Sequence, residues 1–142
     1  MSDEDASGGA FDMSSTFVHL DAGPGAFRLP DFAWTQEYLD SYHARFASNG
    51  PGRLVSVIDQ HATWDGWERH PRGDELVVLL SGRVDVVQDT AEGTRIVELE
   101  PGLAMINPAG VWHTARVHEP GRALFITPGE GTEFRPLSDA TD

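Results

Sequence analysis

Short runs of β-branched and aliphatic residues recur along most of the chain, with Gly, Pro and Asp residues between them. Their spacing of roughly ten residues is typical of an all-β sandwich or barrel. Seven runs are predicted to form strands: Arg53–Ile58, Glu75–Leu80, Arg83–Gln88, Thr94–Leu99, Leu103–Ile106, Trp112–His118 and Arg122–Thr127. The length of 142 residues fits one such domain.

Two of these runs indicate where their side chains point. Because side chains alternate between the faces of a strand, His113 shares a face with Ala115 and Val117. His113 is therefore predicted to point towards the core. The residues from Leu76 to Leu80 are apolar on both faces, which predicts a central strand buried between two layers.

One helix is predicted, from Thr35 to about Ala47. Its apolar side chains recur at helical spacing and form one stripe, which consists of Tyr38, Leu39, Tyr42 and Phe46. The residues Asn49, Gly50 and Pro51 follow, and they are predicted to end the helix.

The two ends of the chain differ in composition from the middle. Residues 1–15 are acidic and small, which predicts a disordered tail rather than a signal peptide. Residues 16–136 are predicted to form the folded domain and residues 137–142 a frayed C-terminus. No apolar run approaches the ~20 residues that a membrane helix needs, so we expect a cytoplasmic protein.

Composition narrows the possible partners and chemistries. The chain has 23 Asp and Glu residues against 10 Lys and Arg, and its formal charge of −13 disfavours nucleic acids and anionic membranes. It has no cysteine, which excludes disulfides and thiolate sites, and all its basic residues are arginine, which excludes lysine-based mechanisms. We expect a small molecule, a cation or another protein as partner.

A first group of ligand-type side chains lies in the segment Trp67–Glu75. On an extended segment Glu68 and His70 share one face. A turn at Pro71–Asp74 then lets Glu75 return beside them on the next strand. A buried carboxylate at Glu75 would be costly without a cation or a hydrogen-bond donor, because apolar residues follow it.

A second group, Pro101–His113, places a turn, a short strand and another turn before the inward-pointing His113. This histidine is the natural fourth member of the first group. Two imidazoles and two carboxylates suit Mn, Fe(II), Ni, Co or Zn better than Ca or Mg. The sequence therefore predicts a site for one divalent transition metal and leaves the choice of metal open. Its predicted ligands are Glu68, His70, Glu75 and His113.

The two groups together resemble the cupin superfamily, whose first motif places paired ligands, a Glu and a Gly, and whose second runs Gly, Pro, Gly, His. These positions are here Glu68, His70, Glu75 and Gly82, then Gly102, Pro108, Gly110 and His113. The resemblance covers about Arg53 to Thr127, and the segment from Trp67 is similar to a subgroup of small single-domain cupins that mostly lack an assigned reaction. The chain departs from the pattern at Glu68, where the family usually has a His.

The resemblance implies a double-stranded β-helix jelly roll, often a homodimer, with a metal in the mouth of the barrel. We expect a metal-dependent enzyme that acts on a small organic molecule by dioxygenase, isomerase, lyase or cyclase chemistry. The role of Glu68 stays open between a metal ligand, a neighbour of the ligands, a catalytic acid or base, and an outward-facing charge. A non-catalytic small-molecule-binding or sensor cupin is the alternative function, and a metal-free epimerase with a His–carboxylate dyad ranks third.

Overall fold

The computed structural model describes residues 9–137, which divide into two compact units with the boundary between Val57 and Ile58. Of the predicted tails, residues 1–8 and 138–142 lie outside this described part. Asp12 begins a turn before the first strand, where its main-chain oxygen accepts a hydrogen bond of 2.9 Å from the Thr16 N–H. Within residues 9–137, no helix is both long and apolar enough to cross a membrane.

The first unit combines one helix with a small antiparallel sheet. Its elements are β1 (Phe17–Leu20), β2 (Ala26–Leu29), α1 (Gln36–Phe46), the 3-10 helix η2 (Ala47–Asn49) and the start of β3 (Arg53–Gln60). Strand β1 pairs with β2 on one side and β3 on the other. The hydroxyl of Thr35 caps α1 by accepting a hydrogen bond of 3.1 Å from the Tyr38 N–H. The predicted helix is therefore confirmed to within one residue at each end.

Aromatic rings pack α1 against β1. The buried imidazole of His19 stacks on Phe46, with 3.8 Å between the ring centroids, and its Nδ1 lies 2.6 Å from the hydroxyl of Tyr42. Burial lowers the pKa of His19. This histidine is thus a packing residue of the first unit.

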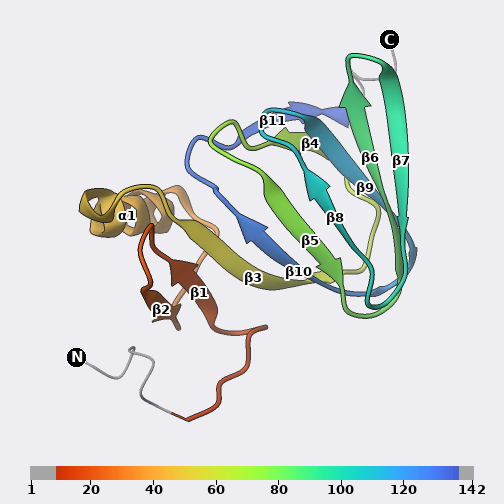
Figure 1. The fold of residues 1–142 in the computed structure, drawn as a ribbon. Coiled ribbons are helices and arrows are strands. Elements are labelled where there is room, and N and C mark those ends of the chain that lie inside the picture. The colour runs from red at the N-terminus through yellow and green to blue at the C-terminus, as the bar shows by residue number, and fades with distance from the viewer. Residues whose placement is uncertain (1–8, 138–142) are drawn as a thin grey trace. The chain divides into compact units, whose positions relative to one another are not determined.

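The second unit is a sandwich of two antiparallel sheets (Figure 1). One sheet has the order β10 (Gly121–Thr127), β5 (Glu75–Leu79), β8 (Ala104–Asn107). The other has the order β11 (Glu133–Pro136), β4 (Gly66–Arg69), β9 (Trp112–Glu119), β6 (Arg83–Thr90), β7 (Gly93–Leu99). From β4 to β11 the chain changes sheet at every connection except β6 to β7. This is the predicted jelly roll.

The hydrophobic core of the second unit lies between its two sheets. Its buried members are Val77, Leu79, Val84, Val86, Leu99, Met105, Ala115, Ala123 and Phe125. On β5, Val77 and Leu79 are buried, whereas Leu76 and Val78 on the outer face are only half-buried. The prediction that this strand is buried on both faces is therefore confirmed for the inner face and wrong for the outer one, because no second layer fully covers it.

All seven predicted strands are present, with ends that differ by at most two residues. The strands β1, β2, β4 and β11 were not among the predicted runs, and each is four residues long. Alternation over so few residues does not stand out from the surrounding sequence. These strands are defined by the partners with which they pair.

We predict that Leu79→Ala lowers the free energy of unfolding by about 3 kcal/mol, the typical loss for a fully buried leucine. Leu79 has no exposed surface, whereas Ile96 on β7 is 49% exposed. Ile96→Ala is therefore the matched control and should cost less than about 1 kcal/mol. Urea denaturation of both variants measures the two effects, and equal losses would contradict this placement of the core.

Candidate metal centre

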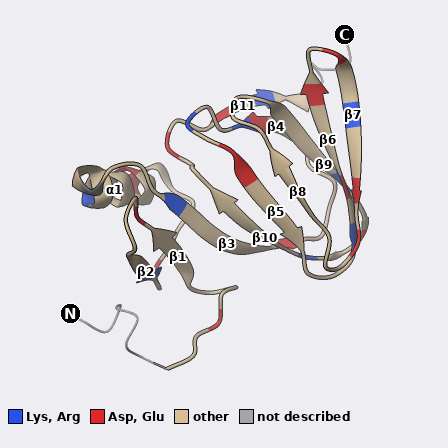
Figure 2. Cartoon of the chain, viewed as in Figure 1, with Lys and Arg blue, Asp and Glu red and all other residues tan. Residues whose placement is uncertain are grey.

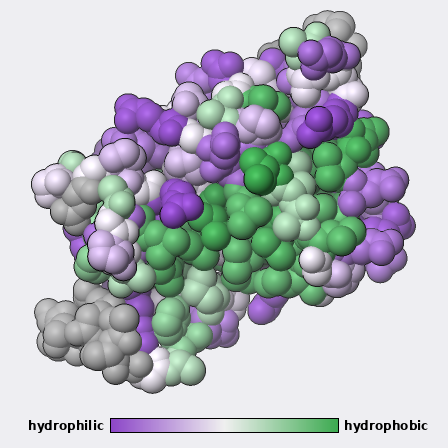
Figure 3. All heavy atoms as spheres, in the orientation of Figure 1, coloured by the Kyte–Doolittle hydropathy of each residue, from purple (hydrophilic) through white to green (hydrophobic). Residues whose placement is uncertain are grey.

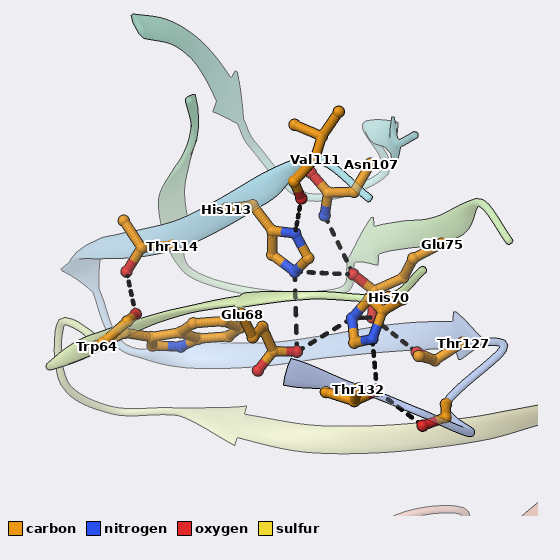
Figure 4. Close-up of polar contacts among 12 residues, drawn as sticks. Trp64, Glu68, His70, Glu75, Asn107, Val111, His113, Thr114, Thr127 and Thr132 are labelled. Atoms are coloured by element: carbon orange, nitrogen blue, oxygen red, sulfur yellow. Dashed lines mark hydrogen bonds and ion pairs between the residues drawn. The ribbon is translucent and has the colours of Figure 1, made fainter. Parts of the chain in front are cut away.

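Three strands from both sheets bring the predicted ligands together (Figure 4). Glu68 on β4 pairs in register with His113 on β9, and His70 follows directly after β4. Glu75 is the first residue of β5 in the opposite sheet. The predicted turn between His70 and Glu75 therefore carries the chain from one sheet to the other and closes the cluster.

Two backbone contacts join the loops that carry the ligands. The N–H of Gly110 donates a hydrogen bond of 3.1 Å to the carbonyl of His70. The carboxylate of Asp74 accepts a hydrogen bond of 2.9 Å from the N–H of Ala109. Gly110 has a φ of 77°, a conformation that favours glycine. Asp74 thus serves the turn and not the ligand cluster.

The four residues bring their potential ligand atoms within 4.8 Å of one another. The Nε2 of His70 lies 3.1 Å from Glu68 Oε2 and 3.2 Å from Glu75 Oε2. The Nε2 of His113 lies 3.3 Å from Glu75 Oε1 and 3.7 Å from Glu68 Oε2. Ligand atoms bound at about 2.0–2.2 Å to one ion are roughly 3–3.5 Å apart. The spacing therefore fits a single transition metal ion.

Both Nε2 atoms are buried, and neither has a hydrogen-bond partner in suitable geometry. The nearest oxygens of Glu68 and Glu75 lie 3.1–3.7 Å from these nitrogens without forming hydrogen bonds to them. Buried nitrogens without partners are costly. An ion bound among the four ligand atoms would satisfy both nitrogens at once.

The other ring nitrogen of each histidine has a partner that fixes the tautomer. Thr132 donates its hydroxyl hydrogen to the Gly129 carbonyl at 2.7 Å, so it can only accept from Nδ1–H of His70, at 2.8 Å. Nδ1 of His113 lies 3.2 Å from the carbonyl of Val111, which is also only an acceptor. Once an imidazole is neutral, it therefore keeps its proton on Nδ1 and presents the Nε2 lone pair to the other members of the cluster, as metal-ligating histidines do.

Glu75 is held on both oxygens by neutral donors. Asn107 donates to Oε1 at 3.1 Å, and the hydroxyl of Thr127 donates to Oε2 at 2.7 Å. The amide of Gln88 donates to the side-chain oxygen of Asn107 at 3.0 Å, which orients the Asn107 amide towards Glu75. Because both oxygens of Glu75 accept hydrogen bonds, this series of hydrogen bonds favours the ionised carboxylate, which is the form that binds a metal.

Glu68 is less constrained than Glu75. Its side chain is 23% exposed, against 3% for Glu75, and only its Oε2 is within reach of the two imidazoles. The three other ligand residues are buried. Glu68 is therefore the most exposed member of the cluster and the one with the fewest hydrogen-bond partners.

Burial disfavours the charged form of all four groups, but the attraction between the carboxylates and the imidazoles outweighs this effect of burial. Burial alone would lower the pKa of each histidine, yet the carboxylates of Glu68 and Glu75 raise the pKa of His70 and of His113 to about 9. The two imidazoles in turn hold the pKa of both carboxyl groups below their ordinary value. Without a metal, the cluster is thus a buried ionic network.

Two hollows of different size adjoin the cluster. An inner cavity of about 20 Å³ lies in the core, and His113 is the only one of the four ligand residues that lines it. An outer hollow of about 620 Å³ is lined by Glu68 among the four, together with Phe134, Arg135 and Pro136. The indole of Trp64 lines both hollows and lies beside Glu68 in Figure 4.

The other aromatic and basic residues of the first motif face away from the cluster. Arg69 pairs with Glu133 and lies over the ring of Trp112, at 4.6 Å from the centroid. Arg135 lies over Trp67 and Trp112. Trp67 and Trp112 therefore pack with arginines, and Trp67 also lines the outer hollow together with Trp64.

The residues that orient the ligands were not identified from the sequence. They are Gln88, Asn107, Thr127 and Thr132. Asn107 lies within the second motif, so its position gave a signal, and Thr127 ends a predicted strand. Gln88 also ends a predicted strand, but only tertiary pairing shows that it reaches the site, and Thr132 lies outside every predicted strand.

We predict that metal-free protein is most stable between about pH 4.5 and 6.5. The stabilisation from His70 and His113 is complete below their ordinary pKa of 6.5 and is lost as the pH rises to about 9. The contribution of Glu75 is complete above its ordinary pKa of 4.5 and is lost below it, because its pKa is lowered.

Thermal melts of chelator-treated protein test this prediction. The Tm should fall by at least about 5 °C between pH 6 and pH 9, since ~1 kcal/mol moves the Tm of such a domain by roughly 3 °C. His118→Gln, which changes a histidine paired with Asp85 outside the cluster, should keep this dependence. The variant His70→Gln/His113→Gln/Glu68→Gln/Glu75→Gln, which removes all four titrating groups, should lose it; a dependence that survives in this variant would contradict the assignment.

The chain matches the family model described as "Cupin domain" over residues 46–127, more than half of its length. No curated protein matches the chain significantly. Among solved structures, a cupin-2 domain containing protein from Shewanella frigidimarina NCIMB 400 is similar, with 15% identity, a TM-score of 0.45, and 59% of this chain and 70% of that chain covered.

The structures of two enzymes are similar to this chain, with nearly the same identity and TM-score. Hydroxypropylphosphonic acid epoxidase from S. wedmorenis has 16% identity and a TM-score of 0.46, and the match covers 53% of this chain and 43% of that one. Hydroquinone 1,2-dioxygenase from Sphingomonas sp. TTNP3 has the same identity, TM-score and coverage of this chain, with 58% of its own chain covered. The chain thus matches less than two thirds of either enzyme. By its match to the family model, the chain belongs to the cupin domain family.

Proposed function

We propose that this cupin is a mononuclear divalent-metal enzyme that acts on a small organic molecule. The observation that supports this most is the pair of buried Nε2 atoms, on His70 and His113, that lack hydrogen-bond partners and converge on two carboxylates. A purely structural ion pair would gain more from direct hydrogen bonds. The ligand types favour Mn, Fe(II), Ni, Co or Zn.

His70, Glu75 and His113 would form the fixed part of the site. Their orientation is already set by Thr132, by Asn107 and Thr127, and by the carbonyl of Val111. A bound divalent ion supplies Lewis acidity, which polarises a substrate oxygen or lowers the pKa of water. The rigid partners keep the three ligand atoms in place without reorganisation during the reaction.

Glu68 would be both the fourth ligand and the catalytic acid or base. Its Oε1 has no protein partner within the described residues, and its side chain lines the outer hollow. A carboxylate with one oxygen at the centre and one towards the substrate can take up a proton and return it. Glu75 cannot do this, because neutral donors occupy both of its oxygens.

The outer hollow is the proposed binding place of the organic substrate. Its volume of about 620 Å³ lies within the range of about 300–1,000 Å³ that is common for ligand pockets. Trp64, Trp67 and Phe134 supply aromatic surface, and Glu68 supplies the polar contact next to the ligands. A partly apolar small molecule with one oxygen-bearing end fits this lining.

We predict that purified or reconstituted protein contains about one transition metal ion per chain. His70→Ala and His113→Ala should each lose it, whereas His118→Ala on the outer face of β9 should retain it. Plasma mass spectrometry of the four proteins measures the metal, and chelation should lower the Tm of the wild type. Absence of metal from wild-type protein after reconstitution would contradict the proposal.

We also propose that two copies of the chain form a homodimer through the outer face of the sheet β10-β5-β8. This face is apolar, and Figure 3 shows it as a continuous hydrophobic area. The exposed large hydrophobic residues of β5 and β8 and their ends are Leu80, Leu103 and Ile106, at 46–54% exposure. Strand β8 carries no charged residue, as Figure 2 shows. Two chains of charge −13 repel each other, so a contact centred on the uncharged strand β8 favours association.

Light scattering during size exclusion tests this association. The wild type should have twice the chain mass of 15.5 kDa. Ile106→Glu should shift the protein to the monomer, whereas Ile96→Glu on the exposed face of the other sheet should not. A monomeric wild type, or equal behaviour of the two variants, would contradict this interface.

A further inference from the structure

Strand β11 lies at the edge of its sheet, beside β4 (Figure 1). All four of its residues pair in register with β4, and Phe134 lies opposite Glu68. On its other side, within the described residues, β4 pairs in register with β9 at a single position, where Glu68 lies opposite His113. Strand β11 therefore supplies most of the registered pairing of the strand that carries Glu68 and leads into His70.

The start of β11 is attached to one of the predicted ligands. Thr132, the residue before β11, accepts a hydrogen bond of 2.8 Å from Nδ1–H of His70, as Figure 4 shows. Its own hydroxyl hydrogen goes to the carbonyl of Gly129. The next residue, Glu133, forms an ion pair with Arg69 on β4. The position of β11 and the orientation of the His70 ring therefore depend on each other.

The far end of β11 is held by one long side chain. Arg135 donates a hydrogen bond of 2.7 Å to Asp89 on β6, and β4 and β9 lie between β11 and β6 in the sheet. On the way its guanidinium lies over the rings of Trp67 and Trp112, at 5.4 and 4.7 Å from the centroids. Arg135 thus holds β11 in place without contacting any of the four ligand residues.

The turn between β10 and β11 is a suitable hinge. It contains Gly129 and Gly131, and Gly131 has a φ of 82°, a conformation that favours glycine. A Cβ atom added at either glycine would meet no atom closer than 3.9 Å, so the turn is not tightly packed. Short strands at a sheet edge are among the first parts of a protein to open locally. Strand β11 can therefore leave β4 while the core between the two sheets stays intact.

We propose that β11 is a clasp, a strand that closes on β4 when the cluster binds its metal ion. This inference rests on the proposed function and goes beyond it, because it couples the ion to a conformational change. An ion on Nε2 and Thr132 on Nδ1 would orient the same ring of His70, so each reduces the freedom that the other has to remove. Such coupling is reciprocal: the ion stabilises docked β11, and docked β11 strengthens ion binding. Thr132 is the positioning residue that links the two.

Hydrogen–deuterium exchange of full-length protein tests the clasp, with and without Zn²⁺. The amides of Glu133, Phe134 and Arg135 should exchange severalfold more slowly in the Zn²⁺-loaded protein. Strand β7, at the opposite edge of the same sheet, carries none of the four ligand residues and is the internal control. Its amides should slow much less. Equal slowing of β7 and β11, or no slowing of β11 in loaded protein, would overturn the clasp.

Substitutions at Thr132 separate coupling from simple packing. Thr132→Val removes the hydroxyl at nearly constant size, whereas Thr132→Ser keeps it. The valine variant should bind Zn²⁺ about tenfold more weakly, the smaller of the usual effects of losing a partner of a metal-ligating histidine. At saturating Zn²⁺ it should also lose the selective slowing of β11. The serine variant should retain both properties; selective slowing that survives in the valine variant would overturn the role of Thr132.

A second substitution tests the reciprocal effect from outside the cluster. Arg135→Gln loosens β11 without changing a residue that contacts a ligand, and it should weaken Zn²⁺ binding severalfold. Arg95→Gln at an exposed position of β7 is the matched control and should leave the affinity unchanged. Calorimetric titration measures both affinities. Equal affinities of the two variants would overturn the coupling between β11 and the ion.

The zinc content of the same samples keeps the two proposals apart. Wild-type protein that holds Zn²⁺ without selective slowing of β11 would overturn the clasp alone and leave the metal site intact. Wild-type protein that takes up no Zn²⁺ or other transition metal would overturn the proposed function. It would also overturn the clasp, because no ion would then be present to close it.

Discussion

The burial of two carboxylates beside two imidazoles is the interaction on which the site depends. Four ionisable groups in so little solvent are tolerated only if their charges compensate. In metal-free protein, protons on His70 and His113 compensate the carboxylate charges. The carboxylates raise the pKa of both histidines to about 9, so these protons stay bound at neutral pH. A divalent ion supplies the same positive charge and also satisfies both Nε2 atoms. The same geometry thus stabilises the protein in either state.

Around this charge cluster, neutral groups determine which atoms face the centre. One hydroxyl and one carbonyl, next to the two Nδ1 atoms, orient the imidazoles, and Asn107 and Thr127 orient Glu75. Glu68 has no comparable partners, so the site combines three rigid ligands with one adaptable carboxylate. The replacement of the family's usual His by Glu68 therefore need not remove the metal site. It places a carboxylate next to the outer hollow, which is the group that our proposal uses for proton transfer.

The sequence was informative where a single local pattern determines the position of a side chain. Alternation predicted that His113 points inward, and the strand-turn-strand order predicted that Glu75 returns beside Glu68 and His70. Both predictions match the positions in the structure. The role of these residues as ligands stays a prediction.

Local sequence patterns could not predict the features of the site that depend on contacts between distant strands. Gln88 acts through Asn107, and Thr132 reaches His70 from a segment beyond the last predicted strand. The two hollows result from how tightly many side chains pack, which alternation does not specify. The partly exposed outer face of β5 is a similar case, because the sequence Leu76–Leu80 is apolar whether or not a layer covers it.

The most direct test is calorimetric titration of metal-free protein with Zn²⁺ at pH 7, repeated in buffers of different ionisation enthalpy. It measures whether the cluster binds a metal ion and releases protons as it does so. Both imidazoles carry a proton at this pH, because their pKa is about 9. Binding should therefore release about two protons per ion into the buffer. Failure to bind Zn²⁺, or binding without proton release, would contradict this account of the site.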